Sequence, residues 1–95
     1  MGRLHIVREH QLAWAAACDI ASTWRRAGEE RWGLQCEHQV LEGHEIVGFR
    51  GPGVSGQFWV YPDRFEIEAT LGFLLSAYQG RIASEIEHQL DEALR

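Results

Sequence analysis

Two runs of alternating residues, separated by Pro62-Asp63, restrict the fold of this chain more than any other feature. The runs cover residues 54–61 and 64–71, and in each of them small or apolar side chains occupy every second position. A period of two is typical of a β-strand with one buried and one solvated face. Because proline favours the second position of a turn, the two runs predict a β-hairpin. Glu66 and Glu68 mark the solvated face of its second strand.

Two other segments repeat apolar residues every four positions, as helices with one buried face do. The first segment covers residues 11–32, and Gly33 after it can end a helix because glycine adopts positive φ without a steric penalty. The second segment fills the last quarter of the chain, with a break expected at Gly80. Its four-residue repeat consists of Ile82, Ile86, Leu90 and Leu94.

Three more short strands are predicted at residues 4–10, 34–40 and 45–50, with turn residues between the last two. The predicted order of elements is therefore β-α-β-β-β-β-α. Strands grouped together with helices on either side are typical of an α+β domain. We expect an antiparallel sheet of about four to five strands with two helices on one face. The length of 95 residues predicts a single domain, 1–95.

The charge of the chain argues against a nucleic-acid partner. Fourteen acidic residues and nine basic residues, all of them arginines, give a net charge of −5. An acidic chain repels phosphate backbones, and the one local group, Arg25, Arg26 and Arg31, is typical of a solvated helix face. The sequence contains neither a signal-peptide pattern nor the ~20 apolar residues of a membrane span. We therefore expect a cytoplasmic protein without a transmembrane segment, with Cys18 and Cys36 reduced.

No set of side chains in the sequence indicates catalysis or metal binding. Cys36 and His38 share one face of a predicted strand and could supply half of a metal site, but no two histidines have the i, i+4 spacing of a helical zinc site. Ser55 lies among glycines, but its spacing differs from that of a nucleophile elbow, and a strand follows it instead of a helix. We therefore expect no enzymatic activity, no catalytic residue, no cofactor and no metal.

Apolar side chains outside the predicted core are the candidate binding residues. If the helices cover the Phe58 face of the hairpin, Trp59 and Tyr61 remain on the open face, where exposed aromatic residues can mark an interface. Residues 71–78, LGFLLSAY, are too apolar for a solvated loop, so we expect them to be buried or to touch a partner. The candidates for apolar binding or an interface are Trp59, Tyr61, Phe73, Leu74, Leu75 and Tyr78.

Three stretches of the chain resemble a family of small bacterial proteins, the polyhydroxyalkanoic acid system (granule-region) proteins. The stretches are HIVREHQL, GPGVSGQFWV and LGFLLSAYQGRIASEIEHQLDEAL, which together cover nearly the whole length in the expected order. The resemblance implies a cytoplasmic protein linked to storage-polyester granules. It brings no catalytic site, because the matching positions are glycines and apolar residues of the kind that a fold needs.

Three hypotheses about function remain open at this point. The first is a non-enzymatic accessory protein of polyhydroxyalkanoate granules that binds the polymer surface or another granule protein through apolar contacts. The second is a small carrier of a hydrophobic ligand such as an acyl chain, similar to larger helix-grip domains, which would contain a lined pocket of ~300 Å³ or more. The third is a structural homodimer in which a second copy covers the open face of the sheet.

Overall fold

The computed structural model describes residues 2–94, which form five strands, two main helices and one short helix. In chain order the elements are β1 (Gly2–Glu9), α1 (Trp14–Arg31), β2 (Gln35–Leu41), β3 (His44–Gly51), β4 (Val54–Val60), β5 (Arg64–Leu71), α2 (Phe73–Ser76) and α3 (Gln79–Ala93). The predicted α+β class and the order of strands and main helices are confirmed. The short helix α2 lies in the apolar segment between the last strand and the last helix.

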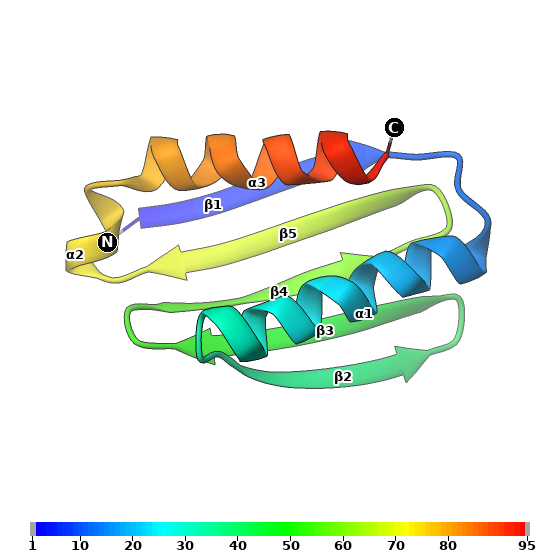
Figure 1. The fold of residues 1–95 in the computed structure, drawn as a ribbon, viewed down its shortest axis with the longest axis horizontal. Helices are drawn as coiled ribbons and strands as arrows, with labels where there is room; N and C mark the ends of the chain where they lie inside the picture. The colour runs from blue at the N-terminus through cyan, green and yellow to red at the C-terminus, as the bar shows by residue number, and fades with distance from the viewer. Residues whose placement is uncertain (1, 95) are drawn as a thin grey trace.

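All five strands belong to one antiparallel sheet with the order β1-β5-β4-β3-β2 (Figure 1). The first strand pairs with the last, so that Gly2 lies opposite Leu71 and Glu9 lies opposite Arg64. Both main helices lie on the same face of this sheet, as predicted. Helix α3 runs along β1, whereas α1 crosses the part of the sheet formed by β2, β3 and β4. No helix among residues 2–94 is long and apolar enough to cross a membrane.

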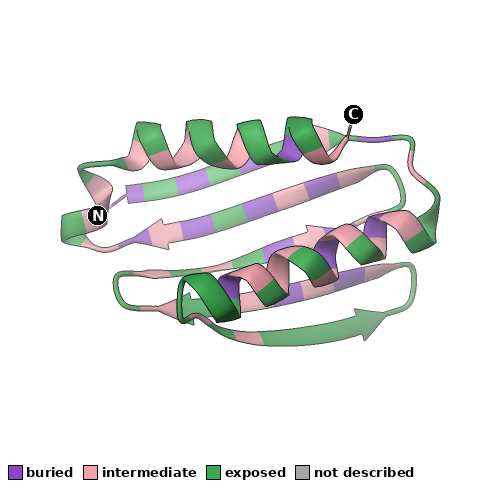
Figure 2. Ribbon diagram, viewed as in Figure 1, coloured by how far each residue is buried: buried purple, intermediate pink, exposed green. Residues whose placement is uncertain are grey.

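The face of the sheet beneath the helices holds the hydrophobic core, and Figure 2 shows the resulting alternation of buried and more exposed positions along the strands. In β5 the buried positions are Phe65, Ile67, Ala69 and Leu71, the alternation predicted for this strand. Glu66 and Glu68 lie between them on the open face, as expected. Within residues 2–94, no helix lies on the other face of the sheet (Figure 1).

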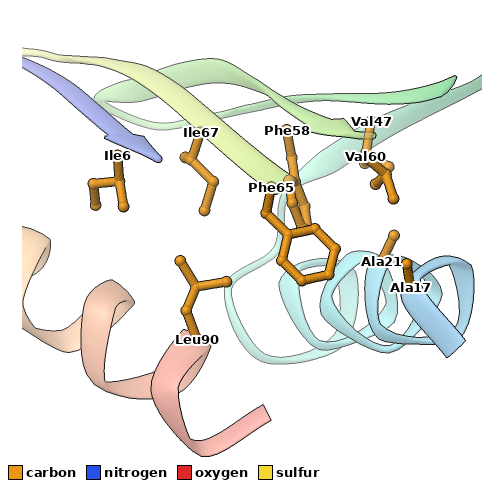
Figure 3. Packing of buried hydrophobic residues seen from close by; sticks show 9 residues of the cluster. All are labelled: Ile6, Ala17, Ala21, Val47, Phe58, Val60, Phe65, Ile67 and Leu90. Atoms are coloured by element: carbon orange, nitrogen blue, oxygen red, sulfur yellow. The ribbon is translucent and has the colours of Figure 1, made fainter. Parts of the chain in front are cut away.

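The centre of the core is Phe65, which points from β5 into the space between the two main helices (Figure 3). Its side chain is completely buried, and its ring lies 5.6 Å from the ring of Phe58 and 4.6 Å from that of His10. The main cluster consists of Ile6, Ala17, Ala21, Val47, Phe58, Val60, Phe65, Ile67 and Leu90. The interior between the sheet and the helices is thus filled by side chains.

Helix α1 begins three residues later than the sequence pattern predicts. The apolar repeat predicts a start at residue 11, but His10 holds the preceding segment in a different arrangement. Its amide donates a hydrogen bond to the Asp63 carbonyl at 2.9 Å, and its Nδ1 accepts the Leu12 amide proton at 3.2 Å. Ala13 is then extended, with ψ of 150°, and the helix starts at Trp14. The apolar repeat begins before this start, which is why it does not reveal the boundary.

The end of α1 agrees with the prediction, whereas the break before α3 lies earlier than expected. Gly33 has φ of 65°, and the Leu34 amide donates to the Gly28 carbonyl at 3.1 Å, as at a glycine-terminated helix. The break near the end of the chain was expected at Gly80. It lies instead at residues 77–78, and Gly80 is already the second residue of α3.

Candidate functional site

The structure separates the six predicted binding residues into two groups at opposite ends of the sheet. Phe73, Leu74 and Leu75 belong to α2, and Tyr78 follows that helix directly. Trp59 lies near the end of β4, and Tyr61 comes just after it. Figure 1 shows that β4 starts near α2 and runs away from it, so that Trp59 and Tyr61 lie far from the other four residues.

The first group forms an exposed apolar surface, which we call the α2 patch and define as Phe73, Leu74, Ala77 and Tyr78. The exposed fractions are 84% for Phe73, 78% for Leu74 and 57% for Tyr78. These residues, together with Ser76, border an open hollow of about 600 Å³. The expectation that residues 71–78 are buried or touch a partner is therefore met by burial only in part, because most of the large side chains after Leu71 face solvent.

Leu75 holds the α2 patch in place by pointing the other way. It packs against the second core cluster, which contains Leu4, Ala69 and Leu71. On either side of the short helix, a hydrogen bond ties the chain to the sheet. The Gly72 amide donates to the Gly53 carbonyl at 2.8 Å, and Gln79 Nε2 donates to the Arg3 carbonyl at 2.6 Å. Because α2 is anchored at both ends and through Leu75, its other apolar side chains project outward from a fixed base.

The stretch of sequence that contains the α2 patch has fewer acidic residues than the rest of the chain. The chain carries 14 acidic residues, but none of them lies between Glu68 and Glu85. The only charged residue in that interval is Arg81, in the first turn of α3. A carboxylate that lost its hydration on contact with an apolar surface would oppose that contact. The patch has no acidic neighbour in the sequence that would have to do so.

The second group lies on the open face of the sheet, and its aromatic rings are partly covered by their neighbours. Tyr61 stacks against His44 with a centroid distance of 5.3 Å, and the Arg64 guanidinium lies 4.0 Å from the centre of the Tyr61 ring. Trp59 is half-buried and borders a shallow hollow of about 300 Å³, which Gln57 and Glu68 also line. Both residues are on the open face, as predicted, but they offer less apolar surface than the α2 patch.

A third feature, a polar cluster around the buried Glu45 under α1, was not anticipated from the sequence. Glu45 is buried at the start of β3, and its carboxylate accepts a hydrogen bond from the Cys18 thiol at 2.7 Å. The other carboxylate oxygen contacts Nε2 of His38 on the neighbouring strand β2. The alternation in β3 contains the signal for this burial, because Glu45 lies two residues before Val47 and therefore shares with it the face that the helices cover.

The side chains of this cluster bind one another, and the Cys18 thiol is left unreactive. Burial, together with the hydrogen bond to Glu45, raises the pKa of the Cys18 thiol to about 12. The thiol is therefore protonated at neutral pH and is a poor nucleophile. Cys36 and His38 share a strand face as predicted, but His38 turns to Glu45. Among residues 2–94, no three His, Cys, Asp or Glu side chains form a group that could hold a metal ion.

Comparisons with known proteins agree with the resemblance of the three sequence stretches. Searches of the curated proteins and of the solved structures found no match. The pattern that defines the family described as "Putative polyhydroxyalkanoic acid system protein" matches residues 4–94, which include every strand and helix at least in part. The chain therefore belongs to this polyhydroxyalkanoic acid system family.

Proposed function

We propose that the chain is a non-enzymatic accessory protein of polyhydroxyalkanoate storage granules, and that the α2 patch contacts the polymer surface. The observation that carries this proposal is the exposure of Phe73 and Leu74 on an anchored helix and of Tyr78 just after it. Large apolar side chains gathered on a surface are a common mark of an interaction site. The family name supports a link to the polyester system. Contact with another granule protein through the same patch is the alternative partner.

The energy available from the α2 patch fits a surface contact. Fully burying a large apolar side chain contributes ~1.5–3 kcal/mol. Association opposes this gain with ~4 kcal/mol or more of lost translational and rotational freedom. Against a cost of about 4 kcal/mol, one buried side chain is too little, two suffice only at the upper end of this range, and all three suffice across it. Trp59 and Tyr61 add less because their rings are already partly covered.

The interior of the molecule favours a surface contact over a ligand carrier. In a carrier of the helix-grip type, the ligand would lie between the sheet and the helices. Here Val60, Phe65 and Leu90 occupy that space and are completely buried. Figure 3 shows Phe65 extending toward Leu90 from the opposite side of this space. An acyl chain could enter only if these side chains moved and the core gave up their contacts.

Co-sedimentation with washed polyhydroxyalkanoate granules tests the proposal. We expect the purified protein to sediment with the granules, and the bound fraction to stay constant or rise as salt is increased from low to high concentration. Apolar contacts do not weaken with ionic strength, whereas contacts between exposed charges are screened. Binding that is lost at high salt would contradict an apolar contact, and an absence of binding at every salt concentration would contradict the proposed function.

A further inference from the structure

A different surface, the outer edge of β2, carries an inference that does not depend on the proposed function. β2 is the last strand of the sheet, so the backbone groups on its outer side have no strand partner among the residues described. Figure 1 shows α1 passing over the sheet and leaving this outer side uncovered, whereas α3 runs along the opposite edge strand β1. Six of the seven residues of β2 are exposed, and Val40, at 72%, is among the most exposed apolar residues described.

Of the features by which proteins usually block an open sheet edge, β2 has one charged side chain, Glu37, and lacks the others. Such features include a very short strand, a proline, a lysine or a β-bulge. β2 has seven residues, QCEHQVL, and contains neither proline nor a lysine or arginine. Its seven residues pair with β3 in one uninterrupted register, from Gln35 opposite Arg50 to Leu41 opposite His44. A regular and uncovered strand of this length is suited to pair with another strand.

We propose that a second copy of this chain adds to β2, so that two antiparallel β2 strands join the two sheets into one. The length and the charge pattern of the strand together favour one register, which is centred on His38, the middle residue of β2, and pairs all seven of its residues. A pairing centred on Glu37 would place the two Glu37 carboxylates directly opposite each other, which is destabilising. A pairing centred on His38 avoids this, because each Glu37 then lies opposite Gln39 of the second copy.

The register centred on His38 also matches the apolar side chains of the strand. It places the exposed Val40 of each copy opposite Cys36 of the other, on the face that the helices cover. Two such pairs form, related by the two-fold axis. The two His38 rings at the centre are turned inward, because each contacts Glu45 on its own β3 strand. The same two-fold symmetry makes the contact closed, so two copies use up both open edges.

Disulfide trapping tests both the contact and its register. In a Cys18→Ala background, Val40→Cys places a thiol opposite Cys36 of the second copy. Directly opposed residues of antiparallel strands have Cα atoms ~4.5–5.5 Å apart, within the range that a disulfide spans. We expect a disulfide-linked dimer on mild oxidation. The matched control is Leu41→Cys, whose side chain lies on the other face of the sheet opposite Gln35, and we expect it to cross-link far less.

Sedimentation velocity of the unmodified protein completes the test. We expect a dimer to form at concentrations up to roughly 100 µM. We expect the dissociation constant of the Val40→Lys dimer to be at least about tenfold higher than that of the unmodified protein, because each of the two symmetric pairs then contains an unpaired edge charge. A protein that is monomeric throughout and does not cross-link would overturn the proposal. A dimer in which the Val40→Cys thiol fails to cross-link with Cys36 would overturn it as well, because the copies would then meet at another surface.

Discussion

The double variant Phe73→Ser/Leu74→Ser is expected to bind polyhydroxyalkanoate granules at least about 100-fold more weakly than the unchanged protein. The two substitutions remove the two most exposed large apolar side chains of the described chain. Each contributes ~1.5–3 kcal/mol when it is buried against an apolar surface, and a loss of about 3 kcal/mol corresponds to roughly a 100-fold change in affinity. The measurement is the bound fraction in a co-sedimentation series with increasing granule surface.

The fold of this variant should be unaffected, because neither side chain takes part in the core. Leu75, which anchors α2 to the second core cluster, is unchanged. Trp32→Ser is the matched control, since Trp32 is 73% exposed and lies outside the α2 patch. We expect Trp32→Ser to bind like the unchanged protein. Equal binding by the double variant and the control, with both folded by circular dichroism, would show that the α2 patch is not the binding surface.

Gly56→Ala is expected to lower the free energy of unfolding by about 3 kcal/mol. Gly56 lies in the central strand β4 and pairs with Ala69. An added Cβ would lie 2.8 Å from the Cα of Ala69 and 2.8 Å from Cζ of Phe49, and it would overlap with the Glu68 carbonyl oxygen. Backbone atoms of a paired strand cannot move aside without breaking the ladder. For a domain of this size the loss corresponds to a drop in Tm of roughly 12–24 °C, measured by thermal unfolding.

A neighbouring glycine provides the control for this substitution. Gly48 lies in β3, next to β4, and the nearest atom to an added Cβ there is the Glu37 carbonyl oxygen at 3.9 Å. Gly48→Ala therefore adds a methyl group without a clash and reduces the freedom of the unfolded chain. We expect a stability change between zero and a gain of ~1 kcal/mol. If the Gly56→Ala variant were as stable as the Gly48→Ala variant, this result would contradict the close approach of β5 and Phe49 to Gly56.

Much of the fold could be predicted because its elements have local signals in the sequence. The alternation in residues 54–71 identifies both the hairpin and its buried face, since side-chain direction in a strand depends only on position. The four-residue repeats identify both main helices for the same kind of reason. The pairing of β1 with β5 has no such local signal. It depends on α1 carrying the chain across the sheet, and only the assembled core selects it.

The candidate site was predictable in composition but not in geometry. The apolar character of residues 71–78 marks them as unusual, yet it does not tell which side chains are exposed. Leu71 and Leu75 pack inward while Phe73 and Leu74 face solvent, because the chain turns into a short helix after Gly72. Glu45 was missed for a related reason. An acidic residue at the start of a strand suggests solvent, and its burial becomes favourable because Cys18 from α1 and His38 from β2 both contact its carboxylate.

Binding to protein-free particles of amorphous polyhydroxyalkanoate is the measurement that most directly tests the central claim. Such particles present the polymer without the proteins that coat a granule, so a contact with the polyester can be separated from a contact with another granule protein. We expect saturable binding that persists at high salt and that the Phe73→Ser/Leu74→Ser variant lacks. Binding to coated granules with none to the bare particles would contradict a direct contact between the α2 patch and the polymer.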